Sequence, residues 1–363
     1  MSAPKVSVII PAYNHGDFVE ECLASVLAQR EVDFEVLIAD DGSQDDTALR
    51  VAKCHDPRVR FWPHVVNRGA CVVVNELLQH AKGTYIALIN SDDVWPRSDK
   101  LALQCALLDA QPELGAIFGR AELMDRNGAA ITASDNPFSG LFNQANRSQA
   151  QWLRFFFERG NCLCHPTMMI RRRCYEDLGG YNNRFRQLPD FEMWVRLIKR
   201  YAIHIADDVW VRFRVRPGEN ASSPTLANCV RDINEHLLLR EQFFAGTSAE
   251  ILQAAFTDWL PKGIDWTDDA HLAVARVWPF LRVTDGPYRR VCRVLAFMKL
   301  RQLLDDERCR QILESNYGFD DRAFQRIMTE EDCLFPHPKQ DKPPGLSIAL
   351  QNATRWIRRR WVA

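Results

Sequence analysis

The fold of this chain is decided by the stretch Gly83-Thr84-Tyr85-Ile86-Ala87-Leu88-Ile89-Asn90-Ser91-Asp92-Asp93. Its apolar part has the length and composition of a buried β-strand, and it ends abruptly in two adjacent carboxylates. Neighbouring carboxylates repel each other unless positive charge lies between them, and Mg²⁺ or Mn²⁺ is the usual source of that charge. The stretch therefore predicts a strand that delivers Asp92 and Asp93 to a cation site, with a solvated turn as the alternative interpretation.

The composition is that of an ordinary globular protein. The chain has 363 residues, of which 47% are hydrophobic and 26% charged, and its formal net charge is -1. A chain of this length buries a sizeable core in one or two domains, and the balanced charge argues against a nucleic-acid partner. The 11 cysteines have no metal-ligand spacing, and we find neither a signal segment nor a membrane-spanning run, so we expect a cytoplasmic protein with reduced thiols.

Strand and helix patterns alternate through the first part of the chain. Short β-branched runs occur at 6–10, 34–39 and 59–62, and amphipathic stretches follow them at 17–29, 47–54 and 70–81. This alternation predicts an α/β fold with a mainly parallel sheet and helices on both faces. In such a sheet, ligands bind outside the carboxyl ends of the strands.

Three predicted strand ends carry polar or turn-forming residues, at 11–14, 40–43 and 90–93, and we expect them to meet in one crevice. Asp40 or Asp41 can accept hydrogen bonds from a base or ribose, while Asp92 and Asp93 hold a cation against a diphosphate. A dinucleotide-binding turn is not expected, because the loop after the first strand contains only Gly16. The pattern predicts a nucleoside-diphosphate site, with a plain turn and helix cap as the alternative at 40–43.

The order and spacing of these motifs resemble those of family 2 glycosyltransferases with the GT-A fold. The resemblance covers roughly residues 5 to 220 and rests on the segments 6–14, 40–43, 67–69 and 83–93, together with Asn75. It implies a GT-A type Rossmann-like sheet flanked by helices, followed by a C-terminal helical region. It also implies an inverting sugar transfer from a nucleoside-diphosphate sugar, with Mn²⁺ or Mg²⁺ as cofactor.

The resemblance gives a nucleotide-binding role to residues that follow the first strands, namely Pro11, Tyr13, Asn14, Asp41, Asn67, Arg68 and Asp92. Among these, Asp41 is expected to bond the base, whereas Asp92 and Asp93 form the ribose and metal end of the D-x-D element. The chain departs from the family at Asn90, where many relatives have Asp, and at Val74, where many have Arg.

A helix predicted at 187–197 should supply the catalytic base. Pro189 suits its first turn, and apolar residues recur along one face. In family 2 enzymes a Glu-Asp pair opens the corresponding helix and its Asp is the base; here Pro189 replaces the Glu and Asp190 remains. An inverting transfer needs one carboxylate that takes the proton from the acceptor hydroxyl, so we expect Asp190 to be the base. A helix-capping role is the alternative for Asp190, and Glu192 is the less favoured base.

Two further residues have open roles. His165 lies in a segment that resembles the family's acceptor-side strand, where it either contacts the acceptor or a phosphate or is structural. Arg216 occupies a segment where relatives often place a His near the diphosphate. Its guanidinium either neutralises phosphate directly or lies on the surface.

The sequence becomes helical towards its end. We predict a catalytic domain at 1–222, a helical domain at 223–335, and a linker with a basic terminal helix at 336–363. Four arginines and two tryptophans in the segment 354–363 suit the surface of an anionic membrane, with a solvated basic tail as the alternative.

Together these features predict an inverting, metal-dependent glycosyltransferase, cytoplasmic or peripheral at the cytoplasmic membrane face. By analogy, its acceptor is a glycan or lipid-linked glycan in bacterial cell-surface polysaccharide biosynthesis. A non-catalytic nucleotide-sugar-binding or scaffold module is the alternative, because Asn90 and Pro189 depart from the pattern at the chemical positions. A sugar nucleotidyltransferase is less favoured, since the loop after the first strand is not glycine-rich with Arg or Lys.

Overall fold

The computed structural model describes residues 3–131, 140–220, 222–223 and 225–330. The described residues divide into two compact units, of which the first extends to Asp258 and the second begins at Trp259. The predicted domain limit at 222 stays a prediction. The segment 354–363, for which membrane contact is predicted, lies outside the described residues.

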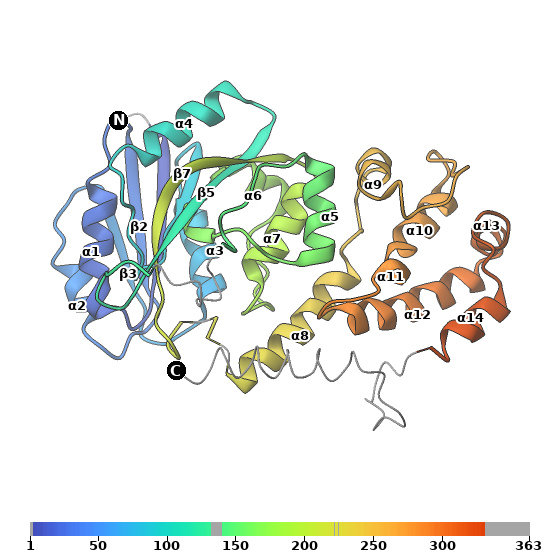
Figure 1. The fold of residues 1–363 in the computed structure, drawn as a ribbon. Coiled ribbons are helices and arrows are strands. Elements are labelled where there is room, and N and C mark those ends of the chain that lie inside the picture. Colours follow the sequence, from blue (N-terminus) through green and yellow to red (C-terminus); the bar gives the residue numbers. More distant parts are fainter. Residues whose placement is uncertain (1–2, 132–139, 221, 224, 331–363) are drawn as a thin grey trace. The chain divides into compact units, whose positions relative to one another are not determined.

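One seven-stranded sheet forms the centre of the first unit in the described part of the chain (Figure 1). The strand order is β3-β2-β1-β4-β6-β5-β7. Within it, β6 pairs antiparallel with both β4 and β5, while the remaining neighbours pair parallel, so the mainly parallel sheet is confirmed. The strands are β1 (Val6–Ala12), β2 (Phe34–Asp40), β3 (Val59–Pro63), β4 (Tyr85–Leu88), β5 (Leu114–Met124), β6 (Met169–Arg171) and β7 (Ala202–Arg214).

Helices flank this sheet, as predicted. In the first unit, α3 packs on β1 and β2, α4 on β5, and α7 on β7, while α5 contacts both α7 and α9. The helices of this unit are α1 (Gly16–Leu27), α2 (Thr47–Ala52), α3 (Ala70–His80), α4 (Lys100–Ala110), α5 (Gln149–Arg159), α6 (Arg172–Leu178), α7 (Pro189–Ile198), α8 (Leu226–Glu241) and α9 (Ala249–Phe256), with a 3₁₀ turn, η1 (His165–Thr167).

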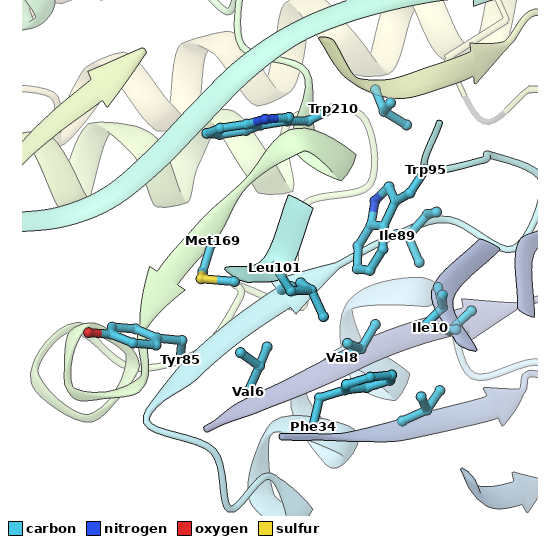
Figure 2. Packing of buried hydrophobic residues seen from close by; sticks show 14 of the residues in the cluster. Val6, Val8, Ile10, Phe34, Tyr85, Ile89, Trp95, Leu101, Met169 and Trp210 are labelled. Atoms are coloured by element: carbon cyan, nitrogen blue, oxygen red, sulfur yellow. The ribbon is translucent and has the colours of Figure 1, made fainter. Parts of the chain in front are cut away.

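The stretch that starts at Gly83 is central to the core, as its sequence indicates. Figure 2 shows side chains of β1, such as Val8, beside Ile89, which follows β4, and Ile89 is fully buried. A Cβ atom at Gly83 would lie 2.4 Å from the backbone nitrogen of Ser7. Glycine therefore permits the close approach of β1 to the start of β4, which fixes where the chain leaves the sheet at Asn90.

The second unit is helical, which confirms the predicted C-terminal helical region. Residues 269–282 form two helices, because Pro279 lacks the N–H that would continue the first. The helices of this unit are α10 (Asp269–Val277), α11 (Pro279–Arg282), α12 (Arg289–Asp305), α13 (Glu307–Tyr317) and α14 (Asp321–Ile327). In the described residues of both units, no helix has the length and apolar character needed to cross a bilayer.

Candidate active site

The carboxyl ends of four strands meet at one edge of the sheet. Because β6 is antiparallel to both β4 and β5, the strands β5 and β7 run in the same direction as β4. The segment after β4 pairs with the end of β7, since the backbones of Val94 and Arg212 exchange hydrogen bonds of 3.2 and 2.8 Å. The end of β2 joins the end of β1 through a 2.8 Å bond from Asp41 N to Ala12 O. This edge is where the sequence predicts a crevice.

Asp41 fastens the loop that precedes α3. One carboxylate oxygen accepts a 2.7 Å hydrogen bond from the backbone N of Arg68, and the other accepts a 2.9 Å bond from Gly69 N. The close approach depends on Gly42, whose φ is +73° and whose added Cβ would lie 2.7 Å from Asn67 N. Each oxygen of a carboxylate has a second lone pair, so a nucleotide base can still bond to Asp41, and this role stays a prediction.

The loop after β1 presents a partly exposed aromatic ring. Tyr13 is 42% exposed, which leaves its ring accessible to a ligand. Asn14 has a left-handed backbone, with φ of 51°, and its Oδ1 accepts a 2.8 Å hydrogen bond from Gln44 N. The Asn14 side chain thus ties this loop to the segment after β2, while Pro11 lies within β1. Their predicted contacts with the nucleotide stay predictions.

Asp93 points into the protein. The structure places its Oδ1 2.8 Å from the backbone N of Arg214 and its Oδ2 3.0 Å from Asn90 Nδ2, both of which donate hydrogen bonds. Burial, and then the neighbouring Asp92, raise the pKa of the Asp93 carboxyl well above its ordinary value. The amide of Asn90 donates a hydrogen bond to Asp93, whereas an ionised aspartate at position 90 could not. This is a physical reason for Asn90, where many relatives have Asp.

Asp92 forms an ion pair with Arg216. Its Oδ2 accepts from Nε of Arg216 at 3.1 Å and from Nη2 at 2.9 Å, and both side chains are at most 7% exposed. Its Oδ1 lies 3.7 Å from Nδ1 of His15. The pair joins the loop after β4 to the residues after β7.

His15 was not identified from the sequence as a site residue. Its Nε2 lies 2.6 Å from Nη2 of Arg216, and since arginine can only donate, Nε2 must be the acceptor. The ring proton is then on Nδ1, which lies 2.7 Å from Ser91 Oγ. Burial lowers the pKa of His15, so the neutral ring fits its surroundings. The sequence signal was weak, because His15 stands in a turn-rich loop without a second histidine nearby.

A divalent cation does not fit these side chains as the sequence predicts. Both oxygens of Asp93 are occupied by donors within the protein, Oδ2 of Asp92 is bonded to Arg216, and Nε2 of His15 accepts from the same guanidinium. In the described residues, no three His, Cys, Asp or Glu side chains are grouped as a metal site. Among these side-chain atoms, Oδ1 of Asp92 has the fewest partners. A single oxygen ligand binds a divalent cation only weakly.

Asp190 lies in the first turn of α7, where its carboxylate is held but partly exposed. Asn161 Nδ2 donates to its Oδ2 at 2.8 Å, and the backbone N of Phe191 donates to its Oδ1 at 2.7 Å. Burial raises the pKa of Asp190 to about 6, although these two hydrogen bonds favour the ionised form and lower it. A carboxylate with this pKa is ionised near neutral pH and still basic enough to take a proton.

Asp190 belongs to the same region as the loop after β4. The pKa of the buried Cys164 thiol is raised by burial first, then by Asp93 and by Asp190, so both carboxylates lie near this thiol. Asp190 also contributes, after burial, to the raised pKa of Cys71 at the start of α3, about 12. Asp190 is therefore close enough to both thiols for its charge to raise their pKa.

Glu235 of α8 was missed by the sequence reasoning. Its buried carboxylate accepts hydrogen bonds of 2.8 Å from the backbone N of Arg186, Gln187 and Leu188, the three residues before α7. These amides precede Asp190 directly, so Glu235 fixes the position of the helix start. Glu235 lies in the helical domain predicted at 223–335, and nothing in the sequence assigns it a partner.

The remaining candidates have structural partners. Nε2 of His165 lies 2.8 Å from the hydroxyl of Tyr181, and burial lowers the pKa of His165 to about 3. This supports the structural interpretation of His165. Glu192 pairs with Arg196 on the next turn of α7 through two contacts of 2.8 Å, which leaves Asp190 as the better candidate base.

The fold defines the class of protein. A solved structure of Staphylococcus aureus TarS 1–349 in complex with UDP-GlcNAc matches 90% of this chain and 90% of its own length, with a TM-score of 0.56 and 17% identity. At this identity the likeness shows the fold alone. The fold is that of a GT-A protein, with polar side chains such as Asp41 and Asp92 at the carboxyl ends of the strands.

Sequence relatives give the family. The family model described as Glycosyl transferase family 2 matches residues 7–179. The putative glycosyltransferase EpsE of Bacillus subtilis is 30% identical over 208 residues, which are 54% of this chain and 68% of the relative. Chondroitin synthase of Escherichia coli is 29% identical over 242 residues, 64% of this chain and 33% of the relative. This chain belongs to glycosyltransferase family 2 and spans about half the length of other curated relatives that it matches.

Proposed function

We propose that this glycosyltransferase moves one sugar, with inversion, from a nucleoside-diphosphate sugar to a hydroxyl group. The observation that carries the proposal is Asp190, a partly exposed residue in the first turn of α7 whose carboxyl has its pKa raised by burial to about 6. A general base needs both access to the hydroxyl and a pKa near the working pH.

In the proposed reaction, the acceptor oxygen bonds to the anomeric carbon while the bond from that carbon to the diphosphate breaks. Asp190 takes the proton of the hydroxyl, and the diphosphate leaves with the bonding electron pair. The bonds from Asn161 and from the Phe191 amide hold the carboxylate in place while it does so. One carboxylate suffices for this inverting step, because no second carboxyl has to form a covalent intermediate.

The donor site is proposed along the ends of β1, β2 and β4. The accessible ring of Tyr13 and the spare lone pairs of Asp41 support contacts with the base, while the role of Asp92 near the ribose stays a prediction. The predicted dependence on Mn²⁺ or Mg²⁺ at Asp92 and Asp93 stays a prediction and is not part of this proposal, because the side chains present do not fit it.

The acceptor is proposed to be a glycan or a lipid-linked glycan. The relative named chondroitin synthase supports a polysaccharide product. Bacterial cell-surface polysaccharide assembly, in the cytoplasm or at the inner membrane surface, is the setting that we propose by analogy with such relatives.

The test measures hydrolysis and transfer across a panel of UDP-, GDP-, ADP- and dTDP-sugars for the wild type, Asp190→Asn and Glu192→Gln. Glu192 is the matched control, because it is an acid on the same helix that is bonded to Arg196. We expect one preferred donor and a loss of about 100-fold or more in Asp190→Asn, with Glu192→Gln close to the wild type. Donor binding without turnover in the wild type would instead support the non-catalytic module.

A further inference from the structure

Arg216 lies at the edge of the sheet where the carboxyl ends of the strands meet, and its side chain is buried. It lies two residues after the end of β7, which runs parallel to β5 and in the same direction as β4. Its side chain is 6% exposed. A buried guanidinium needs acceptors for its N–H groups, because burying a charge without partners is costly.

The acceptors of Arg216 are the groups that a metal ion would use. Nε and Nη2 both donate to Oδ2 of Asp92, at 3.1 and 2.9 Å, and Nη2 also donates to Nε2 of His15 at 2.6 Å. A divalent cation bound to the same oxygen would lie within a few ångströms of this positive charge and be repelled by it. Arg216 therefore occupies the position at Asp92 where a cation is expected.

One part of the Arg216 guanidinium is bonded to an exposed side chain that a ligand can displace. Nη1 carries two N–H groups, and in the described chain it bonds to Oε2 of Glu219 at 2.9 Å. Glu219 is 49% exposed and is shared with Arg126, so this contact is the weakly held side of the group. A diphosphate carries more negative charge than one carboxylate and accepts bidentate bonds from arginine.

We propose that Arg216 supplies the positive charge at the donor diphosphate and that this enzyme works without a divalent cation. The inference rests on the proposed function, since it concerns the same donor. In the transfer step the leaving diphosphate keeps the electron pair of the broken bond, and the fixed charge of Arg216 stabilises it without gaining or losing a proton. Asp92 orients the guanidinium instead of binding a metal.

The neighbouring arginines support a preformed cationic site. Arg214, 1% exposed, donates through Nε to the backbone oxygen of Asp92 at 2.8 Å, and its amide bonds to Asp93. The guanidinium groups of Arg214 and Arg216 lie 4.8 and 5.2 Å from the centre of the Phe18 ring. Such cation–π contacts hold the charges in place before the donor binds.

The test is calorimetric titration of UDP, GDP, ADP and dTDP into the full chain, once with EDTA and once with Mn²⁺. We expect the preferred nucleotide to bind the wild type equally well, within about 3-fold, in both conditions. In EDTA, Arg216→Ala should weaken binding about 100-fold, while Arg216→Lys keeps part of it. Arg126→Ala is the matched control, because Arg126 also pairs with Glu219 and stacks on Phe18 but does not contact Asp92, and we expect wild-type binding.

Arg216→His gives a second readout, since it replaces the charge with a metal-binding imidazole. We expect its nucleotide binding to be lost in EDTA and restored in part by Mn²⁺. Wild-type binding that disappears in EDTA and returns with Mn²⁺ or Mg²⁺ would overturn this inference and leave the proposed function intact. If no nucleoside diphosphate binds in either condition, the proposed function is overturned, and the inference with it.

Discussion

Nδ2 of Asn161 donates a 2.8 Å hydrogen bond to Oδ2 of Asp190. The bond favours the ionised carboxylate and so opposes burial, which raises the pKa of Asp190 to about 6. The negative charge of Glu235 has the opposite effect and raises this pKa further, although by less than burial does. Burial thus sets the basicity of Asp190, and these two neighbours adjust it in opposite directions.

Removal of the Asn161 amide should make Asp190 a stronger base. In Asn161→Ala the carboxylate loses a donor, so we expect the acid limb of the pH profile of kcat/KM to move upward by about 0.5 to 1 pH unit. Gln149→Ala is the control, because Gln149 bonds to the other end of α7 at Ile198 O. An unchanged acid limb in Asn161→Ala would show that Asp190 is not the titrating base.

Replacement of Glu235 should move the acid limb of the pH profile of kcat/KM to lower pH. Glu235→Gln removes the negative charge that raises the pKa of Asp190, and a neutral amide accepts less strongly from the three backbone N–H groups. We expect a lower acid limb, a loss of about 1 to 3 kcal/mol in the free energy of unfolding, and a reduced kcat. Glu241→Gln, at the exposed end of α8, is the control. A wild-type kcat and acid limb in the folded variant would argue against a positioning role.

The raised pKa of Asp190 also affects stability. The folded state binds the proton more tightly than the unfolded chain, whose pKa is near 3.8, so this group's contribution to stability is present at low pH and is lost as the pH rises through about 6. The Asp190→Asn variant has no carboxyl to titrate at this position, so its stability does not fall in this way. We therefore expect the variant to gain stability relative to the wild type between about pH 3.5 and about pH 6.5, measured by urea unfolding. A constant difference across this range would contradict the raised pKa.

The sheet and its ligand edge could be predicted from the sequence because their signals are local. The strand that starts after Gly83 has an apolar run of strand length, and the alternation with helices limits the topology to a mainly parallel sheet. The place of Asp190 in the first turn of a helix was also predictable, since Pro189 marks the start of an amphipathic stretch, and its role as base stays a prediction from the resemblance. Each of these inferences depends on neighbours in the chain.

The electrostatic partners of the site could not be predicted, because they come from distant parts of the chain. Arg216 lies 124 residues from Asp92, and Glu235 lies 47 residues from Leu188, so no spacing rule connects either pair. The inward direction of Asp93 depends on the backbone amide of Arg214 at the end of β7, which only the sheet order brings near. The two adjacent aspartates, for which the sequence predicts a shared cation site, therefore have different hydrogen-bond partners in the fold.

Asp41 provides a test of the donor loop. In Asp41→Asn one acceptor oxygen becomes an N–H₂ group that faces the backbone N–H of Arg68 or Gly69, which now has no acceptor. We expect the free energy of unfolding to fall by about 1 to 3 kcal/mol and the preferred nucleotide to bind about 10-fold more weakly, because the loop before α3 loses its anchor. Asp56→Asn is the control, since Asp56 also accepts from a backbone amide, that of Arg58, in another turn. Equal losses of nucleotide affinity in both variants would mean that Asp41 acts on the donor through general stability alone.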